Sequence, residues 1–87
     1  MAINYNKVVK QANQISDLSY DLNGEISRLE NLLARIKREW CGPASEAFQS
    51  QLLLLIDDMK ITRHNMNNVS ASIKNAADSM QNRLPLI

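Results

Sequence analysis

The stretch Trp40-Cys41-Gly42-Pro43 lies almost at the middle of the 87-residue chain and decides how the chain folds. A glycine just past a periodic segment is the usual left-handed stop of a helix, and a proline beside it cannot continue that helix but can open the next one. The chain must therefore reverse near residue 42. We predict an all-α helix-turn-helix hairpin in one domain over 1–87, with helix one over about 4–40, the turn at about 41–43 and helix two over about 44–83.

A stripe with alternating steps of three and four residues follows each predicted helix, which is the spacing of a coiled-coil-like seam. In helix one the stripe consists of Tyr5, Val8, Ala12, Ile15, Ser19, Leu22, Ile26, Leu29, Leu33, Ile36 and Trp40. In helix two it consists of Phe48, Leu52, Leu55, Met59, Thr62, Met66, Val69, Ile73, Ala76 and Met80. Two antiparallel helices in contact along these stripes are the expected architecture.

Each stripe has one polar break, Ser19 in helix one and Thr62 in helix two. The two breaks lie about equally far from the turn, so an antiparallel hairpin would place them at nearly the same level. They form either one polar layer that fixes the register of the helices or two small residues that the seam tolerates. Gly24 lies off the stripe and is expected to weaken helix one by roughly 1 kcal/mol relative to alanine.

The composition, with 45% hydrophobic residues and only two glycines and two prolines, is that of a helical chain rather than a disordered one. A single two-helix hairpin buries only one seam, and chains this small rarely obtain enough stability from one core. A partner is therefore expected on physical grounds alone.

Five consecutive apolar residues, 52–56, exceed what one helical stripe can bury. The residues beside the two predicted stripes are Leu18, Leu32, Leu53, Leu54, Ile56 and Ile61. Exposed apolar surface of this kind usually marks a protein interface, and we favour that interpretation. The alternative is a wide core face within the hairpin itself.

Several partners and locations are excluded by the same sequence. The apolar run is far shorter than the about 20 residues that span a bilayer, and the N-terminal residues do not resemble a Sec-type signal peptide. Ten basic and nine acidic residues are mixed along both helices, which argues against a nucleic-acid partner. The cluster Arg35, Lys37 and Arg38 instead complements the negative C-terminal end of helix one.

No catalytic or metal-binding constellation is present. His64 has no second ligand at metal spacing, Asp57 and Asp58 point about 100° apart on a helix, and Cys41 is most simply a small residue between Trp40 and Gly42. All-helical chorismate mutases show that small helical dimers can be enzymes, but such a site needs buried cations and these stripes carry no arginine or lysine. We expect no enzyme activity, no cofactor and no metal.

The tripeptide Trp40-Cys41-Gly42 between two amphipathic helices resembles the Trp-X-Gly family of early-secreted-antigen-like proteins, and the resemblance covers the whole chain. Ala44, Ala47 and Phe48 are similar to the small and aromatic residues that begin helix two in that family. A bare Trp-X-Gly is a weak signal, whereas the same motif at the centre of paired heptads is a strong one.

The resemblance implies a hairpin that dimerises, usually antiparallel, into a four-helix bundle and leaves bacteria by Sec-independent type VII secretion after a cytoplasmic stage. It also implies that Trp40 and Gly42 form the secretion motif of the turn. The partners it implies are a second copy or a related small helical protein, a larger secreted effector and the secretion ATPase.

The tail pattern of the family, a tyrosine followed four residues later by an acid, is absent here. Both tyrosines, Tyr5 and Tyr20, lie in helix one, and Lys74 and Asp78 have the spacing without the aromatic ring. This departure favours export together with a partner that carries the tail signal.

Two questions stay open at this point. Trp40 either covers the end of the core or offers its indole edge to a receptor, and both roles are compatible. The chain is either a non-enzymatic type VII secretion substrate or adaptor, or an intracellular coiled-coil interaction module without an export role.

Overall fold

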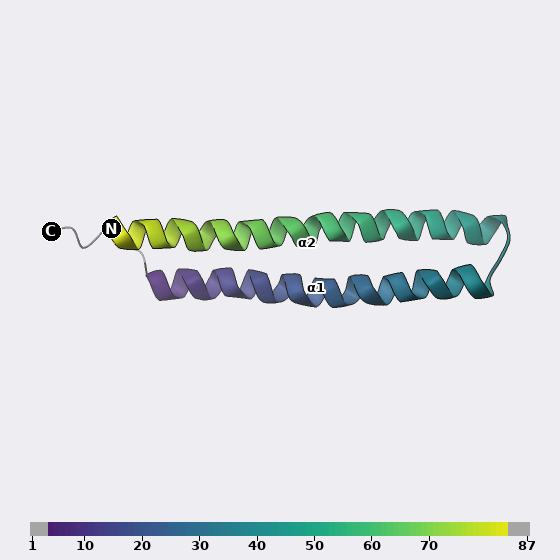
Figure 1. Ribbon diagram of the computed structural model, residues 1–87, viewed down its shortest axis with the longest axis horizontal. Coiled ribbons are helices and arrows are strands. Elements are labelled where there is room, and N and C mark those ends of the chain that lie inside the picture. Colours follow the sequence, from purple (N-terminus) through teal and green to yellow (C-terminus); the bar gives the residue numbers. More distant parts are fainter. Residues whose placement is uncertain (1–3, 84–87) are drawn as a thin grey trace. The chain divides into compact units, whose positions relative to one another are not determined.

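The computed structural model describes residues 4–83, which form two long helices, α1 (Tyr5–Glu39) and α2 (Pro43–Arg83). The helices contact each other and run in opposite directions on either side of the turn, and the described residues contain no strand (Figure 1). The predicted all-α hairpin is confirmed. Residues 1–3 and 84–87 of the predicted 1–87 domain lie outside the described part of the chain.

The contacts divide the chain into two compact units, and each contains a segment of both helices. The turn unit is Tyr20–Arg63, and the terminal unit joins residues 1–19 with 64–87, of which 4–19 and 64–83 are described. The structure therefore gives two antiparallel helix pairs, each with its own set of buried side chains.

The start and the end of α1 follow from local chemistry. Asn4 is the N-cap, since its Oδ1 accepts a hydrogen bond from the Lys7 backbone N–H at 3.1 Å. Such a cap satisfies one of the four backbone donors that a helix start leaves unpaired. Lys37 and Arg38 lie in the last turn of α1, where positive charge favours the negative end of the helix dipole.

The stripe predicted on α1 is the face that this helix buries, with one exception. Its members from residue 5 to residue 36 are buried or half-buried at every position, including Ser19. Trp40 is the exception, because it follows the last helical residue and its side chain is 45% exposed. The spacing therefore gave the phase of α1 correctly.

On α2 the predicted stripe is wrong at six of its ten positions. The face that this helix turns to α1 consists of Ser45, Gln49, Leu52, Ile56, Met59, Arg63, Met66, Ser70, Ile73 and Ala77. Only four of the ten predicted members belong to it, and the predicted members that are exposed instead are Phe48, Leu55, Thr62, Val69, Ala76 and Met80. The difference arises after each residue that belongs to both the predicted stripe and the observed face. There the observed face continues four residues later, whereas the predicted stripe continues three residues later.

Leu55 and Ile56 illustrate the correction. Leu55 was assigned to the seam and Ile56 to an external interface, but Ile56 is 1% exposed and Leu55 is 50% exposed. Ile56 packs with Ile26, Leu33 and Leu52 in the core of the turn unit, so it is not available to a partner protein. Because both residues are large and apolar, periodicity alone does not separate the two phases.

The two units have cores of different kinds. The turn unit buries large side chains, with Leu22, Leu29, Ile36 and Met59 packed around the four buried residues. In the terminal unit the buried apolar side chains are Ala12 and Ala77, and the Ser70 hydroxyl donates to the Ala12 carbonyl at 2.8 Å. Since burial of apolar area is the main stabilising term, the turn unit is the more strongly stabilised pair.

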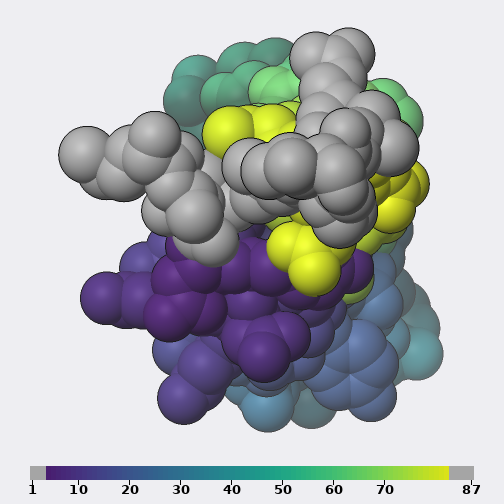
Figure 2. Space-filling view, turned by 90° about the vertical axis from the view of Figure 1, so that its left-hand side faces the viewer, coloured from purple at the N-terminus to yellow at the C-terminus, as the bar shows by residue number. Residues whose placement is uncertain are grey.

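At the far end of the terminal unit, the start of α1 lies against the end of α2 (Figure 2). The Tyr5 hydroxyl donates to Asp78 Oδ1 at 2.5 Å and connects the two helices there. The hydrogen bond to Asp78 raises the pKa of the Tyr5 hydroxyl above its usual value. As the tyrosine is the hydrogen-bond donor, this connection is present below pH 10 and is lost as the hydroxyl ionises.

The proposed polar layer of Ser19 and Thr62 is also wrong, because Thr62 is exposed. Its hydroxyl donates to the Asp58 carbonyl one turn earlier in α2, at 3.0 Å. Ser19 is buried, as the α1 stripe requires. Hydroxyl back-bonding of this kind is the common way in which an exposed helical threonine satisfies its donor.

Gly24→Ala is expected to raise the free energy of unfolding by about 0.5–1 kcal/mol, because alanine loses less backbone entropy in a helix. Gly24 is exposed within α1, and a Cβ added there would meet no atom within 4 Å. Urea denaturation followed by circular dichroism measures the change.

The matched control is Gly42→Ala at the other glycine. Gly42 has a φ of 114°, in the left-handed region that disfavours a side chain, so this variant should be destabilised although the space around it is also open. A loss of stability in Gly24→Ala would contradict the geometry of α1.

Candidate functional site

A short turn reverses the chain between α1 and α2. The Trp40 backbone N–H donates to the Ile36 carbonyl at 2.9 Å and closes α1, and the Glu46 N–H donates to the Gly42 carbonyl at 3.0 Å and opens α2. Gly42 takes the left-handed conformation, and Pro43 is the first residue of α2. The expected roles of glycine as stop and proline as start are observed.

A buried hydroxyl fixes the end of α1 to the start of α2. The Ser45 hydroxyl donates to the Trp40 carbonyl at 2.7 Å and accepts a hydrogen bond from Gln49 Nε2 at 3.0 Å. Ser45 is fully buried. The last carbonyls of a helix have no partner within it, so this contact satisfies one of them and holds the backbone of Trp40 in place.

The Trp40 side chain lies against Phe48 at the surface of the turn. Their ring centroids are 5.9 Å apart, and the rings are tilted by 49°. Both side chains are nearly half exposed, at 45% and 46%. An aromatic pair with this geometry contributes about 0.5–1.5 kcal/mol beyond its buried area. The ring of Trp40 is therefore supported on one side by Phe48 while much of its surface stays accessible.

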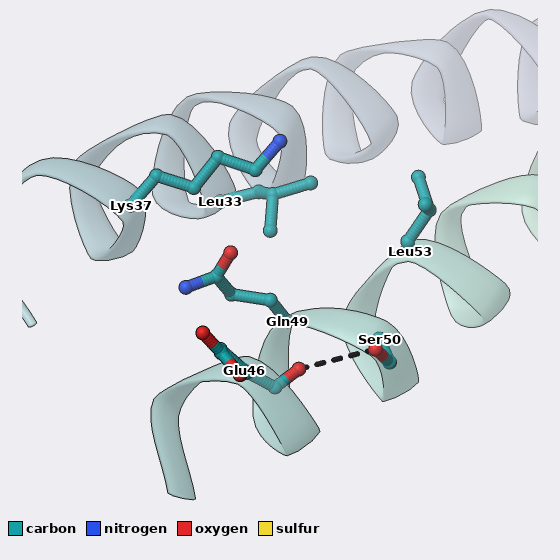
Figure 3. Close-up of a pocket in the computed structure, with 6 residues that line it drawn as sticks. All are labelled: Leu33, Lys37, Glu46, Gln49, Ser50 and Leu53. Atoms are coloured by element: carbon teal, nitrogen blue, oxygen red, sulfur yellow. Dashed lines mark hydrogen bonds between the residues drawn. The ribbon is translucent and has the colours of Figure 1, made fainter. Parts of the chain in front are cut away.

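A small open pocket lies between the two helices of the turn unit, with a volume of about 270 Å³. Leu33 and Lys37 of α1 face Glu46, Gln49, Ser50 and Leu53 of α2 across it (Figure 3). The Ser50 hydroxyl donates to the Glu46 carbonyl at 3.1 Å within its own helix. The pocket is smaller than the typical ligand site of 300–1,000 Å³ and brings no nucleophile to a base.

The side chains that could act in catalysis or bind a metal are at the surface. His64, Asp57, Asp58 and Cys41 are exposed. Within residues 4–83, no group of three or more histidine, cysteine, aspartate or glutamate side chains is placed to hold a metal ion. In the same range, neither helix is long and apolar enough to cross a membrane.

Five of the six residues assigned to a protein interface are exposed, and those on α2 do not share one surface. The five are Leu18, Leu32, Leu53, Leu54 and Ile61. Leu53 lines the pocket, whereas the adjacent Leu54 and the residue seven positions after it, Ile61, project from α2 in another direction. The sixth residue, Ile56, belongs to the core as described above.

Sequence reasoning did not find Ser45 and Gln49, which hold the turn together. Their polarity removed them from a search for apolar periodicity, although both fall on the buried face of α2. The available signal is their spacing from Leu52. Gln49 lies three residues and Ser45 seven residues before it, which places both at seam positions.

Ser45→Ala is expected to lower the free energy of unfolding by about 1–3 kcal/mol, because the Trp40 carbonyl and the Gln49 amide both lose a buried partner. Ser50→Ala is the matched control in the same helix. Ser50 is exposed and bonds only the carbonyl one turn earlier, so its replacement should change stability by less than about 0.5 kcal/mol. Equal effects of both variants in thermal denaturation would contradict the role of Ser45.

Comparison with known proteins gives one family and no individual relative. A family model described as "Proteins of 100 residues with WXG" matches residues 1–83. The comparisons with curated proteins and with solved structures give no match. The matched family consists of small helical proteins associated with type VII secretion. With a Trp-X-Gly turn at Trp40–Gly42 between two long helices and a family match over nearly its whole length, this chain belongs to the WXG100 family.

Proposed function

We propose that this chain is a non-enzymatic type VII secretion substrate or adaptor that acts as a homodimer or as half of a heterodimer. The observation that carries the proposal is the exposed indole of Trp40 at a hairpin turn, in a member of a family associated with type VII secretion. Trp40 and Phe48 place two half-exposed aromatic rings next to each other at the turn, and neighbouring exposed apolar side chains are typical of an interaction site.

The turn has the properties of a recognition element. Gly42 sets the direction of the chain, Ser45 holds the Trp40 backbone, and Phe48 supports the indole ring. Aromatic side chains that are already ordered lose little conformational entropy when a partner binds them. In this proposal Trp40 and Gly42 form the part of the export signal that the chain itself supplies.

Dimerisation completes the proposed unit of function. The remaining residues proposed for the interface are Leu18, Leu32, Leu53, Leu54 and Ile61, all of which have exposed side chains. Because those on α2 point in different directions, a partner covers only part of this set. The partner is a second copy or a related small helical protein. A larger secreted effector and the secretion ATPase are the further partners of the exported pair.

The tail pattern of the family, a tyrosine followed four residues later by an acid, is absent from α2. Tyr20 is exposed in α1, and Tyr5 is engaged by Asp78. The chain therefore travels with a partner that carries the tail signal, or with an effector that does. Before export it resides in the cytoplasm, and its destination is outside the cell by a Sec-independent route.

Export is tested by measuring the secreted fraction of the protein in a bacterium with an active type VII system and in the same strain without the secretion ATPase. We expect the protein in the culture medium of the first strain only, with a cytoplasmic marker absent from both media. Retention in the cells of both strains, even with a co-expressed family partner, would favour an intracellular interaction module and contradict the proposal.

A further inference from the structure

An asparagine in the middle of α1 is followed by a glycine. The pair is Asn23-Gly24, and every other asparagine of the chain precedes a residue that carries a side chain. Both residues are exposed, and a Cβ added at Gly24 would meet no atom within 4 Å. In an asparagine-glycine pair the backbone nitrogen of the glycine reaches the asparagine side chain most readily, because no side chain hinders its approach.

The reaction open to such a pair is deamidation, and its only co-reactant is water. The Gly24 backbone nitrogen forms a bond to Asn23 Cγ, the Cγ–Nδ2 bond breaks, and ammonia leaves with the proton that the backbone nitrogen gives up. Water then opens the resulting five-membered imide ring. Hydrolysis of the bond to Cγ gives aspartate, and hydrolysis of the bond to the main-chain carbonyl carbon gives isoaspartate.

The closed helix opposes this reaction. Within an α-helix each N–H donates to the carbonyl four residues earlier, so α1 engages the Gly24 nitrogen. Asn23 must also leave its helical backbone angles before its Cγ can reach that nitrogen. A glycine in place of an alanine favours local opening of a helix about fivefold. The reaction therefore proceeds from the locally opened form of α1.

Arg63 of α2 contacts the side chain of Asn23 across the hairpin. Its Nη1 donates to Asn23 Oδ1 at 2.5 Å, and the two residues are 40 positions apart in the sequence. Both belong to the turn unit. Arg63 is half-buried on the face that α2 turns to α1. The guanidinium that holds the amide in the closed hairpin is therefore in place to pair with a carboxylate at the same position.

The neighbours of Asn23 on its own helix face carry no charge. Those three and four positions away are Ser19, Tyr20, Ile26 and Ser27. A carboxylate at position 23 therefore meets no like charge along that face. It would replace a hydrogen bond from Arg63 to a neutral amide by one to a carboxylate, which is the stronger contact.

We propose that Asn23 is a deamidation site of this chain and that Arg63 stabilises the hairpin that contains the aspartate product. Aspartate leaves the backbone of α1 unchanged and pairs with Arg63. Isoaspartate adds one carbon to the main chain and interrupts the hydrogen bonds of α1. Deamidation to either product takes the formal net charge from +1 to zero, because it adds one carboxylate. The converted fraction increases with the time that α1 spends open.

The first test follows the purified protein at mildly alkaline pH, in buffer and in urea that unfolds the chain. Peptide mapping by mass spectrometry gives the converted fraction at each asparagine. We expect Asn23 to be converted in urea, and about 10–100-fold more slowly in the folded protein. Asn31 is the internal control, since it is exposed in the same helix and precedes Leu32. It should stay intact over the same period.

Three outcomes of this test would overturn the site. They are equal conversion of Asn23 and Asn31 in urea, equal rates at Asn23 in the folded and the unfolded protein, and an intact Asn23 in the folded protein after about 100 half-lives of the unfolded chain. Gly24→Ala should slow the conversion in buffer at least about fivefold, because alanine closes the helix and hinders the attacking nitrogen.

The second test examines the pairing with Arg63. Asn23→Asp should raise the melting temperature by about 1–6 °C, and added salt should reduce the gain. The same substitution in the Arg63→Gln background should give no gain. A loss of stability in Asn23→Asp, or an equal gain in both backgrounds, would overturn the role of Arg63. If Arg63→Gln does not fold, a gain that added salt leaves unchanged gives the same negative result.

The third test compares the two products. Chromatography separates the aspartate and isoaspartate forms of the incubated protein, and circular dichroism measures the helix content of each. The aspartate form should keep the helical signal of the original protein, and the isoaspartate form should lose part of it. An isoaspartate form with an undiminished signal would contradict the placement of Asn23 within α1. None of these measurements involves export, so the inference goes beyond the proposed function and is tested separately from it.

Discussion

Ile56→Ala is expected to lower the free energy of unfolding by about 2–5 kcal/mol, because it removes a side chain that is 1% exposed and packed against Ile26, Leu33 and Leu52. The adjacent Leu55→Ala removes a side chain of the same size that is 50% exposed, and it should change monomer stability by less than about 0.5 kcal/mol. Urea denaturation followed by circular dichroism measures both values.

Protein concentration separates folding from association in this pair. The effect of Ile56→Ala should be the same in dilute and in concentrated samples, since the lost contacts lie within one chain. An effect of Leu55→Ala that grows with protein concentration would instead come from association between chains, because binding to a partner stabilises a fold by mass action. The reverse ranking, with Leu55→Ala the more damaging at low concentration, would show that α2 turns the other phase of its heptads toward α1.

Trp40→Phe is expected to reduce export at least about tenfold, while the free energy of unfolding changes by no more than about 1–2 kcal/mol. Phenylalanine keeps much of the contact with Phe48, whose ring lies 5.9 Å away, but it removes the indole N–H and the outer ring edge. The measurements are the secreted fraction in a strain with an active type VII system and the melting temperature of the purified variant.

Tyr20→Ala provides the control for Trp40→Phe, because Tyr20 is an aromatic residue of the same unit whose side chain is 79% exposed. Its loss should leave both folding and export nearly unchanged. Normal export of a well-folded Trp40→Phe protein would remove Trp40 from the recognition surface. A collapsed fold would instead assign the ring a core role that its 45% exposure does not suggest.

Local chemistry explains why the turn and α1 were accessible to sequence reasoning. Gly42 and Pro43 act on the backbone through their own covalent structure, so their effect does not depend on distant residues. The α1 stripe is apolar at all buried positions except Ser19, and no second stripe competes with it. Capping by Asn4 and the basic residues of the last turn are equally local.

The same reasoning failed at the turn between α1 and α2, where contacts join the two helices. Ser45 and Gln49 matter because one hydroxyl lies 2.7 Å from the Trp40 carbonyl and accepts a hydrogen bond from the glutamine amide. Their spacing from Leu52 places both residues at seam positions, but it does not show which carbonyl the Ser45 hydroxyl contacts. The exposure of the Trp40 side chain likewise depends on where α1 ends and on the position of Phe48. The predicted stripe extends through residue 40 and therefore does not reveal this exposure.

The sequence by itself determined that this protein is a helical hairpin with α1 turned to the core along a known face, and it predicted the turn at about 41–43. In the structure α1 ends at Glu39 and α2 begins at Pro43, so the turn lies at 40–42. Only the tertiary structure decided the phase of α2, because apolar residues at both 55 and 56 satisfy either alternation of threes and fours. The hairpin takes the phase in which Ser45 and Ser70 bond carbonyls of Trp40 and Ala12, so that small polar residues enter the seam fully satisfied. Phe48, Leu55 and Val69 are left outside as a consequence. Ser70 and Ala12 are 58 positions apart in the sequence, so a contact of this kind is visible only in three dimensions.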